Sequence, residues 1–118
     1  MKILFVDDNE LNRMVMEDML ELLIEGSEVD VFEDAYAVLE QDVHAYDIIL
    51  SDIDMPGMNG FELLDVLRKE RNYNKPVIAV TAHAVSGDKE KMLSFGFDDY
   101  ISKPVDINKL EDAIKQFQ

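Results

Sequence analysis

Cysteine is absent from the chain, which excludes a disulfide framework and a thiolate metal site. No apolar run approaches the roughly 20 residues of a membrane-spanning helix. The short apolar start, MKILFV, meets the acids of DDNE at once, so it does not form a signal peptide. No repeat, low-complexity tract or linker interrupts the 118 residues, which fit a single domain. We therefore expect a cytoplasmic protein without a membrane partner.

Positive charge is scarce. Lys and Arg total 11 against 26 Asp and Glu, and the formal net charge is -15. Such an excess of acid repels nucleic-acid phosphates, so we expect no nucleic-acid partner. It would suit divalent cations or a basic protein surface, but an acidic coat that keeps a cytosolic protein soluble explains most of it. With 47% hydrophobic residues, the chain has the composition of a folded globular domain.

Five short segments rich in β-branched or aromatic residues alternate with helical patterns. The strands are expected over residues 2–6, 28–33, 46–51, 76–81 and 99–102, and the helices over 10–24, 34–41, 60–70, 86–95 and from about 106. This alternation predicts an α/β fold, an open parallel sheet with helices on both faces. The second strand segment alternates polar and apolar residues, which predicts a sheet edge.

The first helical pattern carries an apolar stripe at i, i+3, i+4 spacing, and we expect this stripe to face the core. Gly26 is expected to cap the end of this helix, and Asn59 with Glu62 stands at capping-box spacing before the third helix. Met16 lies off the stripe, so the spacing places it on the surface, where it could belong to a docking site. The stripe consists of Leu11, Met14, Val15, Met19, Leu22 and Leu23.

Reactive side chains follow four of the five expected strands. Because the carboxyl ends of parallel strands meet at one rim of the sheet, we expect these groups to gather there. They are Asp7 and Asp8 after the first strand, Asp52 and Asp54 after the third, Thr81 after the fourth and Lys103 after the fifth.

Several carboxylates in one pocket repel one another unless some are protonated or a cation binds. Oxygen ligands without cysteine favour a hard cation such as Mg²⁺. A cation with an ammonium and a hydroxyl nearby suits a phosphoryl group, for which Asp52 could be the nucleophile.

The motifs VDD, SDIDMPGMNGFEL, VTA and YISKP together resemble those of the response-regulator receiver domain, the phosphoacceptor module of two-component signalling. The resemblance covers the whole chain and implies a flavodoxin-like sheet of order 2-1-3-4-5 with five helices. We expect one receiver domain over residues 1–118, with no output domain, because the chain ends within or immediately after the fifth expected helix. The Lys103–Pro104 peptide is expected to be cis, as in the family.

By this resemblance, Asp52 accepts a phosphoryl group from a sensor histidine kinase or a histidine phosphotransfer protein. Such a domain catalyses its own phosphorylation and dephosphorylation and is not an enzyme acting on a separate substrate. Asp8, Asp52 and the backbone carbonyl of Asp54 would ligate Mg²⁺, with Mn²⁺ as a substitute, and Asp7 would act through a bound water.

The same resemblance implies a switch. Thr81 would move to bond the new phosphoryl oxygen, and Tyr100 would fill the space that Thr81 leaves. Lys103 would pair with the acceptor before and after phosphorylation. The surface that carries Tyr100 would then signal through contacts with a downstream protein target, or the domain would relay the phosphoryl group.

Two positions vary within the family. Asp54 and His83 would flank the path of the hydrolytic water and tune the lifetime of the phosphoryl group, although a solvent-facing role explains His83 more simply.

Three other hypotheses compete with the phosphoacceptor. A haloacid-dehalogenase-like phosphatase shares the D-x-D pattern, but Pro56 stands where that family has Thr or Val. A calcium loop starting at Asp52 would need Glu where Leu63 stands. A degenerate receiver would keep the fold and serve only as a binding module.

Overall fold

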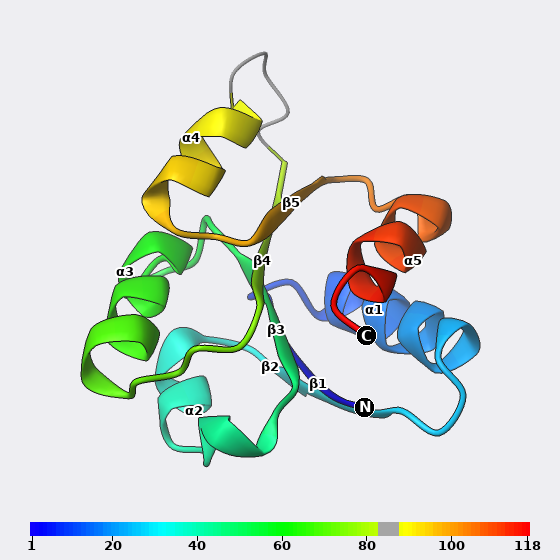
Figure 1. Ribbon diagram of the computed structural model, residues 1–118, viewed down its shortest axis with the longest axis horizontal. Coiled ribbons are helices and arrows are strands. Elements are labelled where there is room, and N and C mark those ends of the chain that lie inside the picture. Colours follow the sequence, from blue (N-terminus) through cyan, green and yellow to red (C-terminus); the bar gives the residue numbers. More distant parts are fainter. Residues whose placement is uncertain (83–87) are drawn as a thin grey trace.

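The sheet is parallel throughout and has the predicted strand order. The computed structural model describes residues 1–82 and 88–118 (Figure 1). Neighbouring strands pair in the order β2-β1-β3-β4-β5, so the chain reverses its winding direction after β2. The strands are β1 (Lys2–Val6), β2 (Glu28–Phe32), β3 (Ile48–Asp52), β4 (Val77–Thr81) and β5 (Asp99–Ser102).

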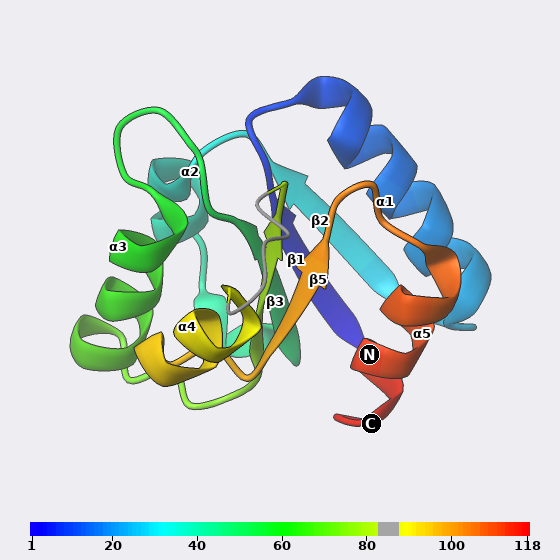
Figure 2. The ribbon, with the colours of Figure 1, turned by 90° about the horizontal axis from the view of Figure 1, so that it is seen from above.

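Helices cover both faces of this sheet (Figures 1 and 2). One face carries α1 (Glu10–Leu23) and α5 (Ile107–Lys115), and the other carries α2 (Ala35–Leu39), α3 (Gly60–Asp65) and α4 (Asp88–Phe95). Two apolar clusters fill the spaces between helices and sheet, one on each face. The prediction of a doubly wound α/β fold is confirmed, and the central strands are apolar because both of their faces are buried.

The burial of the strands explains their sequences. All five residues of β3 and all five of β4 are buried, whereas no residue of the edge strand β2 is. Each fully buried Ile, Leu or Val contributes roughly 1.5–3 kcal/mol to folding. The alternating pattern of β2 therefore correctly predicts an edge strand.

Local signals place most helix ends. The Asn59 side chain accepts a hydrogen bond from Glu62 N, and the Glu62 side chain accepts one from Asn59 N, which completes the capping box of α3. Asp34 and Asp106 are the N-caps of α2 and α5, and the side chain of each accepts hydrogen bonds from backbone N–H groups in the first turn of its helix.

Three details differ from the expectation. A 3₁₀ turn (Val43–Ala45) delays the start of β3 to Ile48, and α3 passes into a π-helical turn (Val66–Glu70). The expected cap at Gly26 is wrong, because α1 ends at Leu23 and Ile24 is already extended. Gly26 lies in the following turn with φ +75°, a conformation that favours glycine.

The prediction for the inward face of α1 is only partly right. Met19 and Leu23 are half-buried and pack against the apolar cluster, as expected. Met16, expected on the surface, is 2% exposed and belongs to that cluster with Leu20, whereas Leu11, Met14, Val15 and Leu22 are exposed. The inward row begins with Asn12, whose amide bonds to Asp7, and continues through Met16 to Leu20 at i, i+4 spacing. Because this row begins with the polar Asn12, the apolar periodicity of the sequence does not reveal it. The exposed apolar residues of the outer face have the spacing that is typical of a core-facing stripe.

Among the described residues, no helix combines the length and the apolar character needed to cross a membrane.

The two methionines of α1 give a direct test of this orientation. We expect Met16→Ala to lower the free energy of unfolding by about 2–4 kcal/mol, because it opens a cavity under the helix. Met14→Ala should change it by less than about 0.5 kcal/mol, because Met14 is 59% exposed. Urea denaturation followed by circular dichroism measures both, and equal losses would contradict the observed face.

Candidate functional site: an acidic pocket at the strand ends

The register of the sheet brings the predicted acids together. Val6 pairs with Ser51, so the residues that follow them, Asp7 and Asp52, are neighbours at the rim of the sheet. Further along, Asp52 pairs with Val80 and Thr81 pairs with Ser102, the residue before Lys103. Parallel pairing therefore carries four separate sequence segments to one edge.

Three carboxylates form the centre of this site. Asp7, Asp8 and Asp52 each offer an oxygen, and the three oxygens lie within 4.8 Å of one another. Asp7 and Asp52 are buried, whereas Asp8 faces solvent, which leaves one side open to an ion and to a ligand. An all-oxygen donor set of this size suits a hard divalent cation such as Mg²⁺, which keeps part of its water shell. Asp54 follows two residues after Asp52 and is exposed in the loop above the pocket.

Lys103 supplies the positive charge opposite these acids. Its Nζ donates a hydrogen bond to Asp7 Oδ2 at 2.8 Å and lies 3.2 Å from Asp52 Oδ1. Burial opposes its charge, but the hydrogen bond to Asp7 and the charges of Asp52 and Asp7 outweigh burial, so the pKa of Lys103 is raised. The ammonium is therefore fixed between the two buried acids, and the Lys103–Pro104 peptide is cis, as expected.

The surroundings of Asp52 disfavour the ionised form of its carboxyl group. Burial and the neighbouring Asp7 raise its pKa from 3.8 to about 6, although Lys103 and the N–H of Ile53 favour the ionised form. Ile53 N donates to Asp52 Oδ1 at 2.8 Å and so fixes one carboxylate oxygen. Because the remaining repulsion is not cancelled by Lys103 alone, a bound cation would complete the neutralisation.

Sequence reasoning missed the groups that hold Asp7. Asn12 Nδ2 donates to Asp7 Oδ2 at 3.3 Å, Arg13 Nη1 donates to Asp7 O at 2.7 Å, and Asn9 N donates to Asp7 Oδ1 at 2.9 Å. All three donors belong to α1 or its N-cap. The spacing of Asn12 is the one signal that could have revealed it. Asn12 precedes the buried Met16 and Leu20 at i, i+4 spacing, so it lies on the same side of α1.

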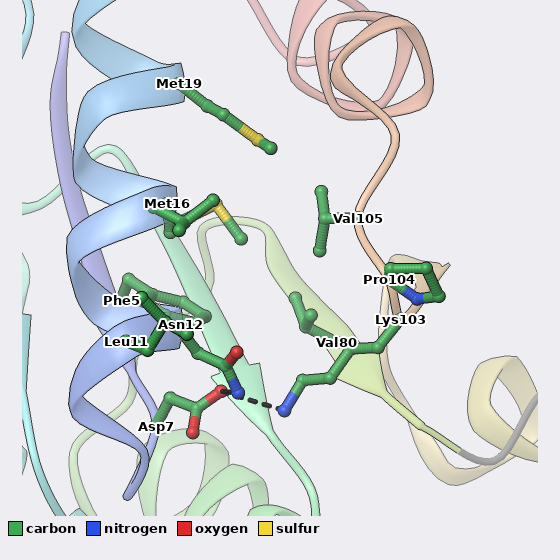
Figure 3. Close-up of a pocket in the computed structure, with 11 residues that line it drawn as sticks. Phe5, Asp7, Leu11, Asn12, Met16, Met19, Val80, Lys103, Pro104 and Val105 are labelled. Carbon is green, nitrogen blue, oxygen red and sulfur yellow. Dashed lines mark hydrogen bonds and ion pairs between the residues drawn. The ribbon is translucent and has the colours of Figure 1, made fainter.

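A pocket of about 330 Å³ opens beside these groups, between α1 and the segment after β5 (Figure 3). Asp7, Asn12 and Lys103 meet at one end of it, and Met16, Met19 and Val105 line the part farther from the acids. The acidic pocket is therefore continuous with an apolar groove along α1.

The remaining predicted residues lie nearby or outside the described chain. Thr81 is buried at the end of β4, and Tyr100 is half-buried on β5, packed against the cluster under α2, α3 and α4. His83 lies outside the described residues. The roles proposed for Thr81, Tyr100, Asp54 and His83 stay predictions.

The fold and the pocket together define a class: a doubly wound α/β protein with an acidic cation site at the carboxyl ends of its strands. The chain belongs to the response regulator receiver domain family, whose model matches residues 3–115. The D-x-D pair of Asp52 and Asp54 therefore belongs to a receiver of two-component signalling, not to a haloacid-dehalogenase-like phosphatase.

Solved receivers have the same fold. The receiver domain of the Francisella response regulator 1452 is 30% identical, and the match covers 98% of this chain and 94% of that one with a TM-score of 0.85. The receiver domain of the sensor histidine kinase PA1611 from Pseudomonas aeruginosa PAO1 is 34% identical, with 98% and 95% covered and a TM-score of 0.81. That structure has a magnesium ion coordinated in its active-site cleft.

Among curated proteins, the sensor protein GacS of Pseudomonas syringae pv. syringae is 36% identical over 118 residues. The match covers 96% of this chain but only 13% of that sensor, so the chain spans a small part of the relative's length. The expectation of one domain over residues 1–118 without an output domain stays a prediction.

The raised pKa of Asp52 predicts a pH-dependent stability in the metal-free protein. The folded state holds the Asp52 proton up to about pH 6, whereas the unfolded chain releases it near 3.8. The unfolded state therefore binds fewer protons between these values, and the contribution of Asp52 to the free energy of unfolding falls as pH rises through this window, by roughly 1–3 kcal/mol.

The comparison with Asp52→Asn isolates this effect from other acids. We expect the stability of the variant relative to the wild type to increase between about pH 4 and pH 6.5, and then to level off. Urea denaturation in the presence of a chelator measures it, and two parallel pH profiles would contradict the raised pKa.

Proposed function

We propose that this receiver accepts a phosphoryl group on Asp52 from a phosphorylated histidine of a sensor kinase or a phosphotransfer protein. The observation that carries the proposal is that three carboxylates meet within 4.8 Å and that the half-buried ammonium of Lys103 contacts two of them. A binding module without chemistry has no need of this charge cluster, whose acids repel one another. The argument favours an active acceptor over a degenerate receiver.

The proposed chemistry balances with the phosphorylated histidine as donor and water as the only other reactant. An ionised Asp52 oxygen attacks phosphorus, the bond from phosphorus to the histidine nitrogen breaks, and that nitrogen keeps the electron pair and later takes a proton. Lys103 lies 3.2 Å from Asp52 and would neutralise an oxygen of the incoming group. In the second step a water attacks the acyl phosphate, the bond from the Asp52 oxygen to phosphorus breaks, inorganic phosphate leaves and the carboxylate is restored, so the domain would catalyse both steps on itself.

Asp7, Asp8 and Asp52, with the backbone carbonyl of Asp54, would hold Mg²⁺ or its substitute Mn²⁺. When bound, the cation supplies positive charge for the phosphoryl oxygens and lowers repulsion among the acids. Asp7 is already bonded to Lys103, Asn12 and Asn9, so it is fixed in place for a contact through a water.

Output would depend on Thr81 and Tyr100. Thr81 is buried one residue beyond Val80, the register partner of Asp52, so a short movement would bring its hydroxyl to a phosphoryl oxygen. Tyr100 pairs with Ala79, two residues before Thr81, and could fill the space that Thr81 leaves. Such a movement would alter the face formed by α4, β5 and α5, where a downstream protein target would bind.

Labelling tests the acceptor. We expect wild-type protein incubated with Mg²⁺ and a small acyl phosphate donor to gain one hydroxylamine-labile phosphoryl group, because an acyl phosphate is labile to that nucleophile. Asp52→Asn should gain none. Intact-mass spectrometry before and after hydroxylamine measures both.

Asp112→Asn serves as the matched control, because it makes the same chemical change at an exposed residue of α5 that is not part of the acidic cluster. It should still be labelled once. Labelling of Asp52→Asn at another residue, or no labelling of the wild type, would overturn the acceptor assignment.

The outward face of α1 is the docking surface that we propose for the phosphodonor. The exposed side chains of Leu11, Met14, Val15 and Leu22 form an apolar surface, and Leu11 and Val15 also line the groove that leads to Asp7 and Lys103. Acidic residues of the same helix surround it, namely Glu10, Glu17, Asp18 and Glu21. This chemistry favours a partner whose apolar helical surface has a basic rim.

Truncation of this face should separate docking from chemistry. We expect Leu11→Ala to slow transfer from a phosphorylated histidine protein about five- to tenfold relative to phosphorylation by a small acyl phosphate, because lost apolar contact weakens docking. Phe95→Ala, which removes an exposed aromatic ring from α4 on the opposite face of the sheet, is the control. An equal slowing with both donors would count against the docking surface.

A further inference from the structure

An aromatic ring rests on the loop that follows the acceptor. Tyr36 belongs to the first turn of α2 and is 54% exposed, yet its ring lies against Gly57 in the β3–α3 loop. A Cβ added to Gly57 would stand 3.0 Å from Cε2 and 3.2 Å from Oη of Tyr36. Gly57 also has φ +77°. The left-handed backbone therefore favours glycine at this position, and a Cβ there would also press against the Tyr36 ring.

The loop under this ring carries Asp54, whose carbonyl would be a cation ligand. Its inner side is packed tightly. Ile53 and Met55 are buried, Gly60 N donates to Ile53 O at 2.9 Å, and a Cβ on Gly60 would come within 2.4 Å of Asp52 O. The Tyr36 ring contacts the loop from the α2 side, so the segment from Asp52 to Gly60 is held at both of its flanks.

The segment that carries Tyr36 is connected to Asp7 through the end of β2. The strand before α2 ends at Phe32, whose carbonyl accepts a hydrogen bond from Asp7 N at 3.1 Å. Asp34 then caps α2 by accepting from Ala37 N at 2.8 Å, which fixes the turn that carries Tyr36. Figure 2 shows the β3–α3 loop curving beside the start of α2. The ring thus connects a segment bonded to one acid with the loop that bears Asp54.

We propose that Tyr36 is a positioning residue for the divalent cation site. Its ring supports Gly57 and thereby sets the place of the Asp54 carbonyl relative to Asp7, Asp8 and Asp52. Tyr36 touches neither the cation nor the acceptor, so it acts only through the loop. This inference rests on the proposed function, because it takes the acidic pocket and the Asp54 carbonyl as the cation site.

Calorimetric titration of the full chain with MgCl₂ tests this role. We expect Tyr36→Ala to weaken Mg²⁺ binding about tenfold, the size of effect seen when groups that orient metal ligands are removed. Tyr36→Phe should bind Mg²⁺ like the wild type, because the ring remains. Ile107→Ala is the control for loss of an exposed apolar side chain, since Ile107 begins α5 on the opposite face of the sheet.

A second measurement separates cation positioning from general damage. Phosphorylation of Tyr36→Ala by a small acyl phosphate should be slow at low Mg²⁺ and return to the wild-type rate at saturating Mg²⁺. A structural defect at Asp52 would instead lower the rate at every concentration.

A double-mutant cycle tests the contact itself. Gly57→Ala should also weaken Mg²⁺ binding, because its Cβ meets the ring and its backbone is strained. Adding Tyr36→Ala to Gly57→Ala opens room for that Cβ, so the combined loss should be smaller than the two single losses multiplied. Strict multiplicativity would overturn a role that works through this contact.

The outcomes separate this inference from the function on which it rests. Wild-type protein that does not bind Mg²⁺ would overturn both. Wild-type binding with an unchanged affinity in folded Tyr36→Ala would overturn the positioning role alone. If Tyr36→Ala does not fold, Tyr36→Leu removes the planar ring while keeping bulk, and the same weakening is expected of it.

Discussion

The properties of the acidic pocket depend on one electrostatic interaction. The buried carboxylates of Asp7 and Asp52 repel each other, and the ammonium of Lys103 offsets this repulsion only in part. Asp7 and Asp52 are both buried, and Lys103 lies within 3.2 Å of each. Two negative charges and one positive charge leave a deficit, and the exposed Asp8 adds to it. This deficit of positive charge favours binding of a divalent cation and is consistent with the phosphoacceptor function that we propose. The repulsion among these carboxylates is unfavourable, and a bound cation would reduce it.

The fold provides the stiffness that such a site requires. Fully buried strands β3 and β4 fix Asp52 and Thr81 at their ends, and α1 fixes Asp7 through Asn12 and Arg13. The same helix presents exposed apolar side chains to solvent, the surface that we propose for docking of the phosphodonor. If that proposal holds, α1 both supports the acids and binds the partner. The Tyr36–Gly57 contact lies on the α2 side of the loop that follows Asp52.

Local sequence signals predicted much of this architecture. The capping box at Asn59 and Glu62 and the alternating edge strand β2 both depend on neighbours within a few residues, so they can be recognised in the sequence. The acids at the strand ends could be found for a similar reason, since parallel strands carry their ends to one rim. Helix α1 shows the limit of such reasoning. Its apolar residues occupy two faces, and only contact with the sheet decides that Met16 and Leu20 are buried while Leu22, 80% exposed, is not.

The sequence alone determined the order of the elements, the capping box before α3 and the rim on which the acids meet, because these follow from local spacing and from the rules of parallel pairing. Only the tertiary structure decided how the charges are shared. Lys103 bonds to Asp7 as well as to Asp52, Asn12 turns inward to the same carboxylate, and Tyr36 lies on Gly57. These contacts join residues from different elements, and their distances arise from packing of helices on the sheet, which no local pattern specifies.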